Sequence, residues 1–183
     1  MVETTDRTEA AIAALAERDD PAAGDEYTRA AWTRLADPRE GLSPFDADDK
    51  GWVGHGLAAL AAAGLAYRVA GQDARASRRA VEGVAVARDL KTGLDAPAQR
   101  ACLEEFVADF RAIGDVGDVS GAYETAADLY REAETAVESP QARATTPLFE
   151  AAAAPLIRTA VTIFGALSCS RTPRGLIRTA VSL

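Results

Sequence analysis

The sequence predicts an all-α protein built from antiparallel helical hairpins that stack on one another. Three observations carry this prediction. Apolar residues recur at helical spacing along most of the chain, and sustained alternation of the kind that marks strands is nearly absent. Proline, glycine and aspartate also punctuate the helical segments at short intervals, which favours tight turns between neighbouring helices.

The first 50 residues contain two helical segments and a loop. Residues 5–17 and 22–36 each place apolar side chains on one face, and Asp19-Asp20-Pro21 separates them. The second segment ends before Pro38, because proline disfavours helix in the residue that precedes it. Residues 37–49 hold two prolines and five acidic residues, so we expect a loop there.

Four further helices are expected before Ser139-Pro140. The first two, over about 51–70 and 73–91, meet at a turn that begins with Gly71. The third starts near Pro97, since proline is tolerated in a first helical turn, and the fourth follows Gly114. The third helix has the clearest apolar stripe of the chain, formed by Leu103, Phe106, Val107, Phe110 and Ile113.

Composition and charge exclude several classes of partner. The 183 residues carry a formal charge of −8, whereas binding to nucleic acid or to an anionic membrane surface requires clustered Lys and Arg. No apolar run reaches the roughly 20 residues of a membrane helix, so no integral membrane segment is expected. The amino terminus is polar and acidic, unlike a signal peptide, and we therefore expect a cytoplasmic protein.

The amino-acid usage indicates the host. Alanine dominates, asparagine is absent, and only Lys50 and Lys91 among the 20 basic residues are lysines. This bias is typical of a high-GC genome, and together with the acidity it favours a halophilic host over codon bias alone.

The last 33 residues differ from the rest in charge. Residues 1–150 form the expected helical domain with a charge of −12, whereas residues 151–183 carry four arginines and no acidic residue. The hexapeptide Leu-Ile-Arg-Thr-Ala-Val occurs twice in this tail, at 156–161 and 176–181. We expect helices that cap the exposed end of the stack. Docking on a membrane or an acidic partner, and self-association, remain alternatives.

A repeat emerges when the turn at Gly71 is aligned with the turn at Gly114, an offset of 43 residues. A weaker copy lies near residues 10–30, and large and small residues alternate in every copy. The strongest copy, residues 110–133, resembles the tetratricopeptide repeat (TPR) family, and the resemblance covers about 8–138. It departs from the family in its separations of 53 and 43 residues and in lacking the closing proline, so an unrelated helical bundle remains an alternative. The alignment matches two sets of residues in order: Leu60, Ala63, Gly64, Tyr67, Ala76, Ala80 and Gly83 of one copy, and Leu103, Phe106, Val107, Phe110, Val119, Tyr123 and Ala126 of the next.

The resemblance implies a scaffold that binds a peptide or a partner's helix in a concave groove. The first helix of each hairpin would line this groove. Arg68 and Arg111 occupy equivalent places in two copies, so two guanidinium groups would grip one carboxylate. The alternative is two solvated arginines that pair with nearby acids. By position, the groove would include Ile12 and Leu15, and then Leu65, Arg68, Glu104, Ala108 and Arg111.

Motifs for catalysis and ligand binding are weak. His55 is the one histidine and lies in Gly-His-Gly-Leu-Ala-Ala, which matches a dinucleotide fingerprint only in its spacing, since that motif needs a preceding strand. We expect His55 near the start of a helix beside Trp52. A calcium loop beginning at Asp46 fails because Lys50 and Leu57 stand where oxygen ligands are required, so no metal site is expected.

The remaining polar groups have structural interpretations. Cys102 and Cys169 match neither a disulfide framework nor a metal motif, and Cys102 is expected in the core. Carboxylate pairs such as Glu104-Glu105 are interpreted as solvated charge. The set Arg75, Arg78, Arg79 and Arg88 is interpreted as a salt-bridging helix face rather than a nucleic-acid site.

Taken together, these features predict a non-enzymatic adaptor without a cofactor that binds a protein or peptide partner. One alternative is a helical-bundle enzyme or small-ligand binder that uses carboxylates and His55. The other is an oligomeric structural protein that assembles through residues 151–183.

Overall fold

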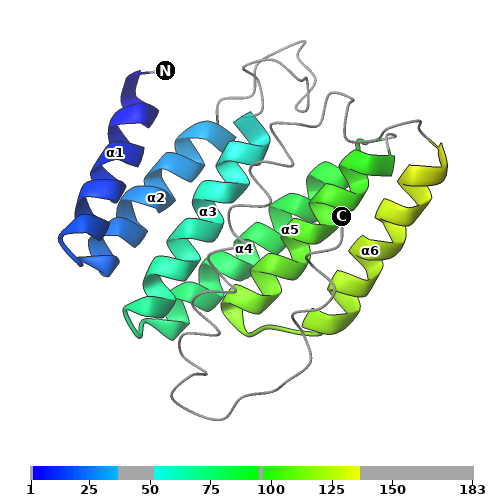
Figure 1. Cartoon of the computed structure of the whole chain (residues 1–183). Helices are drawn as coiled ribbons and strands as arrows, with labels where there is room; N and C mark the ends of the chain where they lie inside the picture. Colours follow the sequence, from blue (N-terminus) through cyan, green and yellow to red (C-terminus); the bar gives the residue numbers. More distant parts are fainter. Residues whose placement is uncertain (1, 37–51, 95–96, 137–183) are drawn as a thin grey trace.

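The computed structural model describes residues 2–36, 52–94 and 97–136 (Figure 1). Over these ranges the chain forms six α-helices and no strand, which confirms the all-α prediction. The expected loop at 37–49, the boundary at residue 150 and the basic tail all lie outside the described residues. The helices are α1 (Val2–Ala16), α2 (Asp20–Leu35), α3 (Trp52–Val69), α4 (Asp73–Lys91), α5 (Pro97–Gly114) and α6 (Val119–Ala136).

The helices form three hairpins that stack side by side, as the sequence predicts. Each helix packs against the next one in the chain, and the first helices of the second and third hairpins, α3 and α5, also contact each other (Figure 1). The turns follow local chemistry. The Asp19 side chain accepts a hydrogen bond from the Ala22 amide and caps α2, and Gly71 takes a φ of 70° in the turn before α4.

The core lies along α3 and α5. The apolar stripe predicted on α5 is buried, and it packs with Leu57, Leu60 and Leu65 of α3 into one hydrophobic cluster. A second cluster joins α1 and α2 to α3 through Ala11, Tyr27 and Tyr67. The central helix α3 therefore contributes to both clusters, which explains why its sequence is apolar on nearly every side.

Large side chains at the ends of α3 and α5 pack on glycines of neighbouring helices. A Cβ atom on Gly24 of α2 would lie 2.5 Å from the Tyr67 ring, and one on Gly83 of α4 would lie 2.4 Å from the Phe110 ring. In both cases the aromatic residue belongs to the first helix of a hairpin, and the glycine belongs to the second helix of the preceding hairpin. Glycine is required there because any larger residue would push the two hairpins apart.

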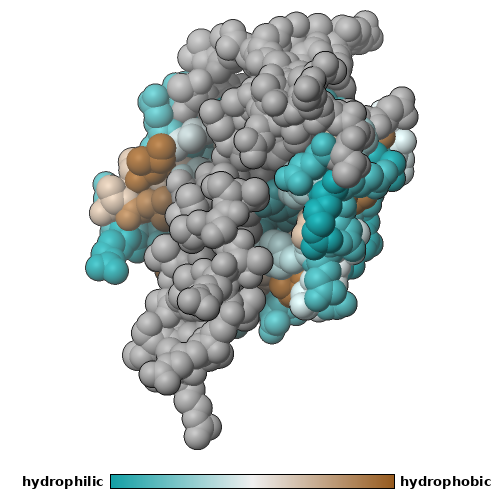
Figure 2. All heavy atoms as spheres, turned by 45° about the vertical axis from the view of Figure 1, so that its right-hand side comes forward, coloured by the Kyte–Doolittle hydropathy of each residue, from teal (hydrophilic) through white to brown (hydrophobic). Residues whose placement is uncertain are grey.

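None of the helices in the described ranges is long and apolar enough to cross a membrane. On the face drawn in Figure 2 the described surface is largely hydrophilic, with a few separate hydrophobic areas. Ile12, Trp32, Val69 and Val81 are among the exposed apolar side chains.

Candidate functional site

Five of the residues predicted to line a groove lie on α3 and α5, and they differ in their accessibility. Leu65 and Ala108 are buried and contribute to the interior rather than to an open surface. Glu104 is 8% exposed, and its carboxylate forms an ion pair with Lys91 of α4. Arg68 and Arg111 are partly exposed, so they form the accessible part of the predicted groove on α3 and α5. On α1, Ile12 and Leu15 are exposed.

The fold brings Arg68 and Arg111 to the same end of the α3–α5 pair. Arg68, at the end of α3, donates from Nη1 to the carbonyl oxygen of Ile113, 2.7 Å away in the last turn of α5. Arg111 lies in that same turn and donates from Nη1 to the carbonyl of Asp118, at 2.8 Å. Arg68 thus satisfies a carbonyl in the last turn of α5, where helix carbonyls lack intrahelical partners, and Arg111 satisfies a carbonyl in the turn before α6.

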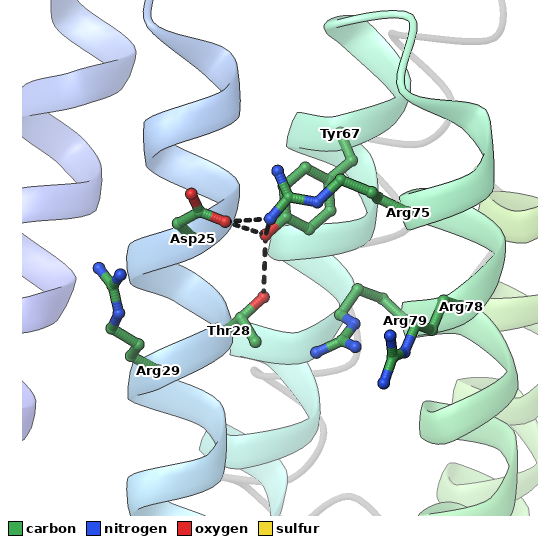
Figure 3. A pocket seen from close by; sticks show the side chains of 7 residues that line it. All are labelled: Asp25, Thr28, Arg29, Tyr67, Arg75, Arg78 and Arg79. Carbon is green, nitrogen blue, oxygen red and sulfur yellow. Dashed lines mark hydrogen bonds and ion pairs between the residues drawn. The ribbon is translucent and has the colours of Figure 1, made fainter.

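A pocket of about 230 Å³ lies between α2, α3 and α4 (Figure 3). Residues of α2 and α4 form its two walls, and Tyr67 of α3 lies between them. Four arginines, one acid and two hydroxyl groups line it: Asp25, Thr28, Arg29, Tyr67, Arg75, Arg78 and Arg79.

A hydrogen-bonded cluster at one side of the pocket joins the three helices. The Tyr67 hydroxyl donates to Asp25 Oδ1 at 2.6 Å and accepts from Arg75 Nη2 at 2.8 Å. The Arg75 guanidinium also pairs with Asp25 and lies over the Tyr67 ring, 3.9 Å from its centroid. Burial alone would raise the pKa of Asp25, but the hydrogen bonds from Tyr67 and Arg75 and the Arg75 charge outweigh it and lower that pKa.

The other lining arginines compete for few carboxylates. Arg78 Nε and Arg79 Nη2 both contact the same oxygen, Glu82 Oε1, at 3.3 and 2.8 Å. On the opposite wall, Glu26 pairs with Arg29 and also with Arg7 of α1. The interpretation of the α4 arginines as a salt-bridging face is therefore confirmed for Arg75, Arg78 and Arg79.

A second polar cluster is buried between α5 and α6. Asp109 is fully buried; its Oδ1 accepts from the Tyr123 hydroxyl at 2.7 Å, and its Oδ2 has no hydrogen-bond partner. One turn earlier, Glu105 Oε2 accepts from the Tyr130 hydroxyl at 2.6 Å. Burial raises the pKa of both carboxyl groups, and the nearby Glu105 charge raises that of Asp109 further.

This burial corrects one sequence interpretation. Glu104 and Glu105 are not a solvated pair, because Glu104 is almost fully buried beside Lys91 and Glu105 faces Tyr130 in the α5–α6 interface. Helix α5 packs on α3, α4 and α6, so side chains away from its apolar stripe are covered as well. Cys102 is buried in the same interior, as expected, and burial raises the pKa of its thiol.

His55 occupies an exposed position in the first turn of α3, as predicted for a residue near a helix start. The segment 54–59 lies wholly within this helix, so its glycines do not form the strand-to-helix turn of a dinucleotide site. Across the described part of the chain, no three His, Cys, Asp or Glu side chains are grouped to hold a metal ion.

Sequence reasoning identified the α4 arginines but missed the pocket. Asp25 and Tyr67 are 42 residues apart, and Asp25 and Arg75 are 50 apart, so no local pattern places them together. The one local signal is that a single acid, Glu82, lies three or four residues along the helix from any of Arg75, Arg78 and Arg79, which leaves positive charge for another helix to meet.

No family model, curated protein or solved structure matches this chain.

Proposed function

We propose that this chain is a non-enzymatic, TPR-like adaptor that binds an acidic peptide or helix of a protein partner. In this proposal it acts in the cytoplasm of a halophilic host, and the binding surface includes Arg68 and Arg111. The observation that carries the proposal is the contact of Arg68 with the last turn of α5, which puts both arginines at one end of neighbouring first helices.

The chemistry of this end suits a carboxylate. Each arginine holds its backbone carbonyl through Nη1, and a guanidinium group has further N–H donors in a planar fork. Two such forks at one end of α3 and α5 provide charge-assisted hydrogen bonds to an acidic side chain or a terminal carboxylate. The stacking of hairpins with α3 against α5 supports the TPR-like arrangement, in which first helices line the binding face.

The test is affinity purification from the native host at high salt, with mass spectrometry of the proteins recovered. The variant Arg68→Glu/Arg111→Glu reverses both charges, and Arg88→Glu/Arg100→Glu makes the same charge change at two other exposed arginines. We expect a partner that is recovered with the wild type and the control and lost with the first variant. Circular dichroism of each variant verifies that the helices remain.

The proposal fails if both double variants recover the same proteins as the wild type. A His55→Ala variant addresses the enzyme or ligand-binding alternative, because an adaptor of this kind keeps its partner when His55 is removed. Deleting residues 151–183 addresses the third alternative, since a protein assembled through its tail would change its size in solution.

A further inference from the structure

We propose that the pocket between α2, α3 and α4 binds a phosphate group, either as the free ion or as a monoester of a small molecule. This site is separate from the Arg68–Arg111 surface, and the inference does not depend on the adaptor function.

The lining of the pocket is positively charged. Four guanidinium groups line it and pair with three carboxylates, on a chain whose net charge is −8. A phosphate monoester carries a charge of about −1.5 to −2 at neutral pH, so these guanidinium groups attract it more strongly than they attract a single carboxylate. The groups counted are Arg29, Arg75, Arg78 and Arg79 against Asp25, Glu26 and Glu82.

The hydrogen-bond donors of the pocket come from two opposite walls. Arg29 comes from the α2 wall and Arg78 and Arg79 come from the α4 wall, so guanidinium groups line both sides of the hollow (Figure 3). Arg79 pairs with Glu82 and its side chain is 13% exposed. Arg29 and Arg78 are also paired, with Glu26 and Glu82, but they are 54% and 76% exposed and have further N–H donors for a ligand. A tetrahedral phosphate accepts from several directions at once, and arginine forks match its oxygens in pairs.

The pocket is built before any ligand arrives. Asp25 and the Tyr67 hydroxyl hold Arg75 from two sides, and this cluster fixes α2, α3 and α4 relative to one another. Because Asp25 is already paired in this cluster, its charge is largely compensated and does not repel an anion. The space of about 230 Å³ is smaller than a drug-sized site and fits a phosphate with a few attached atoms.

Isothermal titration calorimetry of the full chain with inorganic phosphate, at pH 7.5 and constant ionic strength, tests the proposal. We expect saturable binding with a dissociation constant of about 1 mM or below, and much weaker binding of acetate. The variant Arg29→Gln/Arg78→Gln should bind phosphate about tenfold more weakly, because it loses two charge-assisted contacts. Arg88→Gln/Arg100→Gln, which removes two exposed positive charges elsewhere, should bind like the wild type.

A second measurement uses the wild-type chain alone and does not depend on how the variants fold. In NMR titrations, phosphate should shift the backbone amide signals of residues 25–29 and 75–79 more than those of α5 and α6. The proposal is overturned if phosphate does not saturate by about 20 mM, if acetate binds equally well, if both double variants weaken binding alike, or if the shifts spread over all helices.

Discussion

Replacing Asp109 by asparagine should stabilise the protein at neutral and alkaline pH and leave its stability near pH 4 almost unchanged. Asp109 is fully buried between α5 and α6, and the Tyr123 hydroxyl is the hydrogen-bond donor to its Oδ1. An asparagine Oδ1 accepts the same hydrogen bond. The substitution therefore keeps the shape and the one polar contact, and it removes the charge.

The direction of the predicted stability change follows from the raised pKa of Asp109. Between its ordinary pKa, near 3.8, and its higher value in the folded protein, the folded state holds a proton that the unfolded state releases. The free energy of unfolding therefore falls as pH rises through this window, and the full contribution is present only below it. Asparagine binds no proton in this range, so residue 109 of the variant contributes no fall in the free energy of unfolding as pH rises. Glu105, whose pKa is also raised, contributes its own fall in the free energy of unfolding in both proteins.

The magnitude follows from the extra cost of a charge at Oδ2, which is buried without a hydrogen bond. The asparagine Nδ2 is unsatisfied at the same place but carries no charge. Leaving a buried polar atom unsatisfied costs about 1–3 kcal/mol, and more when the group is charged. At pH 8 the variant should be more stable by about 2 kcal/mol, whereas near pH 4 a protonated Asp109 and an asparagine are nearly equivalent. Urea unfolding followed by circular dichroism at pH 4, 6 and 8, at one ionic strength, measures the difference.

The control is Asp89→Asn, which removes an exposed carboxylate on α4 and changes the net charge equally. It should shift the free energy of unfolding by less than about 0.5 kcal/mol at each pH. A gain for Asp109→Asn that is the same at pH 4 and pH 8, or a loss at pH 8, would refute the reasoning from the buried charge.

Three further predictions concern other packed groups. Gly83→Ala should lower the melting temperature by about 3 °C, because the new Cβ meets the fully buried Phe110 ring at 2.4 Å. This overpacking outweighs the gain in helix propensity. A thermal scan that shows no lower melting temperature contradicts the prediction. Tyr67→Phe should cost about 1 kcal/mol in urea unfolding, since Asp25 loses a hydrogen bond; an unchanged midpoint would mean that the cluster adds no stability. In a Cys169→Ser background, the buried Cys102 thiol should react with Ellman's reagent only after unfolding, because burial raises its pKa; rapid reaction of the native protein would contradict its placement.

The sequence predicts the helices well because their signals are local. The α5 stripe ending at Phe110 and Ile113 repeats at the helical period, and Gly71 provides the positive φ of the turn before α4. Such features depend on residues a few positions apart, and short turns then force neighbouring helices into antiparallel hairpins.

The sites are harder to predict because their partners are distant in sequence. The apolar stripe of α5 indicates one buried face, yet α5 packs on three helices and Ala108, Glu104 and Asp109 are covered as well. A periodic pattern cannot show how many helices will surround it. In the same way, the pairing of Asp25 with Arg75 depends on α2 and α4 both flanking the end of α3.

Salt distinguishes the two proposed binding surfaces on physical grounds. At about 1 M salt the Debye length is about 3 Å, so attraction between an acidic partner and exposed arginines acts only at contact distance. In the pocket, the exposed Arg29 and Arg78 are screened in the same way, but Arg79 is only 13% exposed and the Tyr67 hydroxyl and Asp25 hold Arg75 directly. Raising salt from 0.1 to 1 M should therefore slow association with an acidic partner at Arg68 and Arg111 more than it weakens phosphate binding in the pocket.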